Sequence, residues 1–263
     1  MPKGLSTKDK RGIALIILFT LSFLAIFVFL ALPKPDACPA CDQHYLFIDN
    51  SEKIEARDLQ KLVFDDSGQG LLNRIWRELE VGDQLNILTF DAETFDSTYL
   101  SRGALVKPYD PDDINELVQG SRLIKVEFDA ARAKIETVLE NLPKDGMGQT
   151  KIMAGLYDIG IAIDNHRATY KKSDGSAFKY RIILVSDLLE FSNLYNAYSR
   201  SRESFEDWSR GPKFRAGLAD LSGVELEVYQ VQRGLEFQDE SLEMFWAKYF
   251  NASGAYPVKA EDF

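Results

Sequence analysis

Apolar residues in this chain occur first as one long continuous run and afterwards as short, regularly spaced groups. The continuous run covers residues 12–32 and carries no charged side chain. Beyond it, short β-branched and aromatic runs alternate with segments in which apolar residues recur every three or four positions. The short runs are typical of buried strands, and the spaced groups are typical of helices that pack on them. The pattern predicts one hydrophobic helix followed by an α/β domain.

The strand-like runs of the domain differ in how deeply they are expected to be buried. The run 180–186 (YRIILVS) is almost continuously apolar, which is typical of a central parallel strand. The other predicted strands are 44–49, 84–90, 99–107 and 224–231, with a short stretch at 256–258.

Helix-like segments lie between these strands. They are 56–79, 112–142, 151–166, 205–221 and 242–250. Strands that alternate with helices predict a Rossmann-like α/β fold, with a mostly parallel central sheet and helices on both faces. Ligands of such sheets bind beyond the carboxyl ends of the strands, so we look for a site at those ends.

The apolar run 12–32 predicts a transmembrane helix, because about 20 apolar residues are enough to cross the hydrocarbon core. A cleaved signal peptide is the alternative, but its apolar part is usually about 7–15 residues long. Lysine and arginine residues are concentrated before the run, and such residues favour the cytoplasmic side. We therefore expect a single-pass signal-anchor protein, with residues 1–11 cytoplasmic and everything after the span extracytoplasmic. In a bacterium, that places the helix in the inner membrane and the domain in the periplasm.

Residues 33–43 form a predicted linker between the span and the domain, which we place at 44–263. The linker contains the only two cysteines of the chain, Cys38 and Cys41, in a C-P-A-C sequence. A redox motif of this spacing normally precedes a helix in a thioredoxin-like context, whereas this one lies among prolines. A disulfide, local or between chains, is the interpretation that suits an oxidising compartment.

The overall charge makes one class of partner unfavourable. The chain has 263 residues, with 31 Lys and Arg against 41 Asp and Glu, and a formal net charge of −10. A protein of this charge repels nucleic acid over most of its surface. We therefore expect protein partners and a membrane, and no nucleic acid.

Four polar residues are predicted to converge at the carboxyl ends of the strands. Asp49 and Ser51 follow the first strand, Thr150 precedes a helix, and Asp187 follows the strand 180–186. Carboxylate and hydroxyl oxygens, some acting through water, are the ligands that Mg²⁺ prefers. Each residue also has a simpler role, since such side chains often cap helices. Together they form a candidate Mg²⁺ site.

In these residues the chain resembles the von Willebrand factor A (vWA) family, over about residues 44–250. That family has a Rossmann-like fold and a metal-ion-dependent adhesion site, built from an Asp-x-Ser-x-Ser loop, a later Thr and a later Asp. The resemblance matches Asp49 and Ser51 to the loop, and Thr150 and Asp187 to the later residues. The second serine is replaced by Lys53, whose ammonium has no lone pair for a metal. This MIDAS-like site is therefore expected to bind Mg²⁺ weakly or not at all.

The resemblance implies a protein–protein interaction module rather than an enzyme. We expect this module to belong to a cell-envelope assembly. One alternative is a membrane-anchored, Mg²⁺-dependent hydrolase or phosphatase with Asp49 as nucleophile. Phosphatases of the haloacid-dehalogenase type carry a second Asp two positions later, where this chain has Ser51, so the proton donor to the leaving group is missing. Another alternative is a structural spacer subunit, in which the strand-end residues only stabilise the fold.

Overall fold

The computed structural model describes most of the chain after residue 40, within one compact unit that extends from Ala37 to Phe263. The described stretches are residues 41–50, 70–90, 97–108, 121–140, 150–233 and 236–262.

Several predicted features lie outside the described residues. They include the N-terminal segment 1–11, the span 12–32, linker residues 33–40 with Cys38, and Ser51 and Lys53. None of the helices in the described stretches is long and apolar enough to cross a membrane. Cys41 is buried and disulfide-bonded, and the chain's other cysteine is Cys38.

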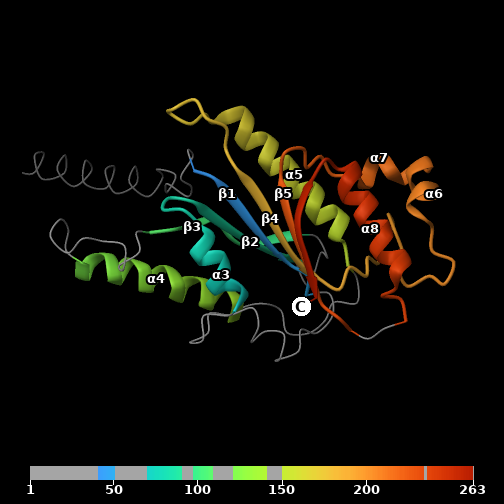
Figure 1. The fold of residues 1–263 in the computed structure, drawn as a ribbon, viewed down its shortest axis with the longest axis horizontal. Helices are drawn as coiled ribbons and strands as arrows, with labels where there is room; N and C mark the ends of the chain where they lie inside the picture. Colours follow the sequence, from blue (N-terminus) through green and yellow to red (C-terminus); the bar gives the residue numbers. More distant parts are fainter. Residues whose placement is uncertain are drawn as a thin grey trace, which may run out of the picture. The chain divides into compact units, whose positions relative to one another are not determined.

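A six-stranded sheet forms the centre of the domain (Figure 1). Its strands are β1 (Gln43–Ile48), β2 (Gln84–Phe90), β3 (Ser97–Val106), β4 (Tyr180–Ser186), β5 (Glu225–Gln230) and β6 (Tyr256–Asp262). They lie in the order β3-β2-β1-β4-β5-β6, and every neighbouring pair is parallel except β2 with β3. The predicted α/β fold with a mostly parallel sheet is confirmed.

The two central strands, β1 and β4, are buried along their whole length. They pair in parallel register from Gln43 with Tyr180 to Ile48 with Val185. Their apolar sequences follow from this position, because a strand covered on both faces has no solvent-facing side chains.

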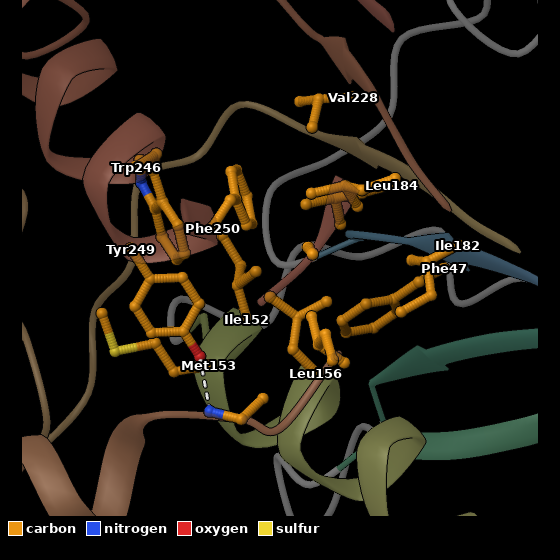
Figure 2. Close-up of a cluster of buried hydrophobic side chains, with 14 of the residues drawn as sticks. Phe47, Ile152, Met153, Leu156, Ile182, Leu184, Val228, Trp246, Tyr249 and Phe250 are labelled. Atoms are coloured by element: carbon orange, nitrogen blue, oxygen red, sulfur yellow. Dashed lines mark hydrogen bonds between the residues drawn. The ribbon is translucent and has the colours of Figure 1, made fainter. Parts of the chain in front are cut away.

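One face of the sheet is covered by α5 (Ile152–Thr169), α6 (Phe205–Arg210), α7 (Lys213–Gly217) and α8 (Glu240–Ala252). Figure 2 shows Phe47, Ile182 and Leu184 of the sheet among the side chains that α5 and α8 bring to this core. Each large apolar side chain buried here stabilises the fold by about 1.5–3 kcal/mol. Tyr249 satisfies its hydroxyl by donating to the Gly217 carbonyl at 2.8 Å.

The opposite face of the sheet packs against α3 (Leu71–Glu78) and α4 (Ser121–Glu140). Ile75 and Trp76 of α3 and Ile135 of α4 are buried against it. Helices on both faces were predicted, and the structure confirms them.

The predicted helix 205–221 is wrong in one respect, because the structure divides it into α6 and α7. The division falls at Gly211-Pro212, where Gly211 is extended with φ −81° and ψ 166°. A residue before proline is pushed away from the helical conformation, so the break follows from the sequence.

The short stretch predicted at 256–258 is longer in the structure, where β6 continues to Asp262 and pairs with β5. The second half of β6 has no apolar pattern, because it contains Lys259, Glu261 and Asp262. The sequence therefore did not predict that the strand extends this far. Charged residues and a bulge are common on edge strands because they prevent pairing with another chain.

Candidate functional site

The topological switch point of the sheet lies between β1 and β4. From β1 the chain continues to β2 on one side, and from β4 it continues to β5 on the other side. In open α/β sheets, ligands bind beyond the carboxyl ends of the strands at this point. The polar residues described here, which we call the strand-end cluster, are Asp49, Asn50, Thr150, Ser186, Asp187 and Glu190.

Asp49 is joined to the end of β4 by a side-chain hydrogen bond. The Ser186 hydroxyl donates to Asp49 Oδ2 at 2.6 Å and accepts the Leu188 N–H at 2.9 Å. The Asp49 N–H donates to the Val185 carbonyl at 2.8 Å. Asp49 and Ser186 are both buried, with 5% and 0% exposed. The carboxylate is therefore held at one position across the switch point.

Asn50 and Thr150 attach neighbouring elements to the same end of the sheet. The Thr89 hydroxyl, at the end of β2, donates to the Asn50 side-chain carbonyl. The Thr150 carbonyl accepts the Phe191 N–H at 3.0 Å, in an isolated bridge. Thr150 is not the cap of α5, because the N-cap position is Lys151. Of the simpler roles considered for these residues, capping by Thr150 is wrong.

Asp187 has three contacts within the domain, two to its carboxylate and one to its main-chain carbonyl. Its Oδ1 accepts the Leu189 N–H at 2.9 Å, and its Oδ2 lies 3.6 Å from Arg233 Nε. Gln238 donates to the Asp187 carbonyl at 3.1 Å. Asp187 Oδ1 thus accepts a backbone hydrogen bond, and the Arg233 guanidinium places a positive charge beside Oδ2.

Glu190 contributes a fully buried carboxyl group to the cluster. Its Oε2 accepts the Met153 N–H at 3.2 Å, in the first turn of α5. Burial raises the pKa of Glu190 to about 8, and the nearby charge of Asp49 acts in the same direction. The carboxyl is therefore protonated at neutral pH, which removes one negative charge from a crowded acidic region.

Leu188 shapes the loop that follows β4. Its φ of 62° lies in the left-handed region, which is uncommon for a residue other than glycine. The Leu188 carbonyl accepts the Trp246 indole N–H at 2.8 Å and the Glu190 N–H at 3.1 Å. The left-handed backbone at Leu188 is therefore held in place by a hydrogen bond from α8.

Three of the four residues predicted from the sequence are described, and all three lie at this end of the sheet: Asp49, Thr150 and Asp187. Ser51 lies outside the described residues. Sequence reasoning missed Ser186 and Glu190, although the acid within the apolar stretch Leu188-Leu189-Glu190-Phe191 was a visible signal. It also missed Arg233, because nothing in the sequence indicates that this residue pairs with Asp187, which lies far from it along the chain.

The Mg²⁺ site predicted from the sequence includes Ser51, which lies outside the described residues, so the structure does not test it. Among the described residues, no group of three or more His, Cys, Asp or Glu side chains is arranged to hold a metal ion. Asp187 faces Arg233, and a guanidinium at 3.6 Å opposes the binding of a cation. Glu190, neutral at pH 7, adds no charge to attract one.

Comparison with known proteins gives similarity to solved structures alone. No family model and no curated protein matches the chain. An aerotolerance-related membrane protein from Bacteroides fragilis matches at 11% identity and TM-score 0.37, over 84% of this chain and 90% of that one. BatB from Bacteroides thetaiotaomicron matches at 13% identity and TM-score 0.38, over 84% and 91%.

Two further structures are eukaryotic. Manganese-loaded TRAP protein from Plasmodium vivax matches at 16% identity and TM-score 0.39, over 85% of this chain and 70% of that one. Proximal thread matrix protein 1 from the mussel byssus matches at 12% identity and TM-score 0.39, and this chain spans 42% of its length. At these TM-scores none of the matches assigns the chain to a family.

Proposed function

We propose that this chain is a membrane-anchored, extracytoplasmic protein–protein interaction module with a vWA-like domain, and that it belongs to a cell-envelope assembly. Residues 12–32 hold it in the membrane, and a protein partner binds at the strand-end cluster. It binds through the protein's own polar groups, without catalysis and without a resident metal ion.

The observation that carries this proposal is the hydrogen bond between Ser186 Oγ and Asp49 Oδ2, at 2.6 Å, across the switch point. It holds a buried carboxylate at the end of the sheet where ligands of α/β proteins bind. Leu188, fixed by Trp246, holds the adjoining loop in a defined conformation. A preformed arrangement of this kind loses little conformational entropy when a partner docks at this end of the sheet.

The hydrogen bonds of the two aspartates favour recognition over chemistry. A nucleophilic carboxylate has to be free to approach its substrate, with a general acid close by. Asp49 Oδ2 accepts from Ser186, Asp187 Oδ1 accepts from the Leu189 N–H, and the Arg233 guanidinium lies beside Asp187 Oδ2.

The test is chemical cross-linking of the full-length protein in its own membrane, followed by recovery of its neighbours. We compare the wild type with Asp49→Asn and Asp187→Asn, which keep the size of each side chain and remove its charge. A protein recovered with the wild type is expected to be lost from both variants.

Glu225→Gln is the matched control, because Glu225 is an exposed acid at the amino end of β5, opposite the cluster. It should leave the recovered neighbour unchanged. If both aspartate variants lower the unfolding temperature but retain the neighbour, the cluster only stabilises the fold, and the spacer interpretation replaces this proposal.

A further inference from the structure

A pocket lies between α8 and the start of α6 together with the loop that precedes it. Its volume is about 390 Å³. It is lined by Arg202–Glu206 and by residues of α8 from Glu240 to Lys248. A cavity of this size is enough for a small ligand or for an anchoring side chain of a partner.

The inner wall of the pocket is apolar and held in place by aromatic packing. Phe245 is almost fully buried and stacks on Tyr195, with ring centroids 3.9 Å apart. Phe205 packs edge-on against Phe245 at 5.8 Å. Met244 lies beside them with 49% of its surface exposed, so the wall offers an apolar surface that solvent reaches.

Arg202 fixes the position of the loop that forms one side of the pocket. Its guanidinium donates to the Phe237 carbonyl at 2.9 Å and also binds Asp239, the N-cap of α8. The loop before α6 is thereby tied to the start of α8. The pocket is built by these internal contacts, and its shape does not require a ligand.

The charges around the pocket do not balance. Both cations of the lining are already paired, Arg202 with Asp239 and Lys248 with Glu206. Glu203 and Glu240 are exposed, and neither side chain forms an ion pair within the described part of the chain. The mouth therefore carries two negative charges above an apolar wall.

We infer that the α6–α8 pocket is a second docking site, which takes an apolar side chain from a protein segment flanked by lysine or arginine. The apolar wall matches the anchoring side chain, and Glu203 and Glu240 match the flanking cations. A fixed pocket that buries one anchor is the usual source of affinity in an interface, and complementary charge adds specificity. This site goes beyond the strand-end function and does not depend on it.

The test uses the full chain and two short fluorescent peptides of equal length, each with a central leucine. One peptide flanks the leucine with lysines and the other with glutamates. Fluorescence polarisation is expected to give the lysine peptide a Kd lower by about tenfold or more. Glu203→Gln combined with Glu240→Gln should raise that Kd about fivefold, since two exposed charge pairs are lost.

The matched control is Glu127→Gln combined with Glu136→Gln, which removes two exposed acids from α4 and changes the net charge equally. It should leave the Kd of the lysine peptide unchanged. Met244→Ser, which leaves the charges in place, should raise it. Equal binding of the two peptides, no binding of either, or equal effects of the two double variants would each overturn the inference.

Discussion

At the scale of single residues, the three acids of the strand-end cluster have different surroundings. Asp49 receives a hydroxyl hydrogen bond, and Asp187 faces a guanidinium. Glu190 receives a helix amide and is buried away from water. Three like charges at one end of a sheet would repel one another, and protonation of the most buried acid removes that cost.

Glu190 should therefore make stability depend on pH. Its pKa is raised from 4.5 to about 8 in the folded state, so between these values the folded protein holds a proton that the unfolded chain has released. Stability from this group is complete below about pH 4.5 and is lost as pH rises towards 8, at about 1.4 kcal/mol per unit. Urea unfolding of the wild type at several pH values measures the decline.

Glu190→Gln is the informative variant, because an amide is neutral at every pH and has nearly the same shape. Its unfolding free energy should fall less between pH 5 and pH 8 than that of the wild type, since the proton linkage is gone. Parallel pH curves for the two proteins would mean that Glu190 ionises as an ordinary exposed carboxyl.

Arg233 and Lys53 together predict little affinity for metal ions. Calorimetric titration with Mg²⁺ and with Mn²⁺ should show no micromolar binding, because Arg233 already neutralises Asp187 and Lys53 has replaced an expected ligand. Arg233→Gln removes that competing charge and should increase whatever weak affinity exists. Clear micromolar binding by the wild type would contradict the proposal of a metal-free site.

At the scale of elements, α5 packs closely on β1 at Gly155. A Cβ built at Gly155 would lie 2.2 Å from Cζ of the Phe47 ring, closer than any real contact. Gly155→Ala should therefore destabilise the protein by about 1–3 kcal/mol, although alanine is the better helix former. Urea unfolding at one pH measures the change.

A second substitution tests the cause. Phe47→Leu removes the ring atoms that the new methyl group would meet, so Gly155→Ala should cost less in that background than in the wild type. The difference between the two costs is the interaction energy of the pair. Additive effects would show that the helix, rather than the ring, responds to the new methyl group.

The elements themselves were largely predictable. Short apolar runs in the sequence predict buried strands, and β2 and β4 begin and end at the predicted residues. Strand ends then pointed to Asp49 and Asp187, because parallel strands place their carboxyl ends together. Ser186 and Arg233 have their roles through contacts with Asp49 and Asp187 that form only in the folded chain. The pattern of apolar residues does not predict these contacts.

At the scale of the whole molecule, one loop connects the two proposed binding surfaces. It begins with Asp187 in the strand-end cluster and ends with Arg202 at the α6–α8 pocket. Gln238 and Arg202 both attach it to the segment that precedes α8. The two proposed sites therefore share one loop, which is held by the same segment before α8.

The proposed topology can be tested on the whole chain. Val258 lies on β6 with 45% of its surface exposed, so Val258→Cys provides a reactive thiol on the domain. In intact spheroplasts, a membrane-impermeant maleimide should label this variant, because the positive residues before the span favour a cytoplasmic N-terminus. Ser6→Cys, before the span, should react only after permeabilisation. Labelling of Val258→Cys only after lysis would place the domain in the cytosol and remove the basis for an envelope partner.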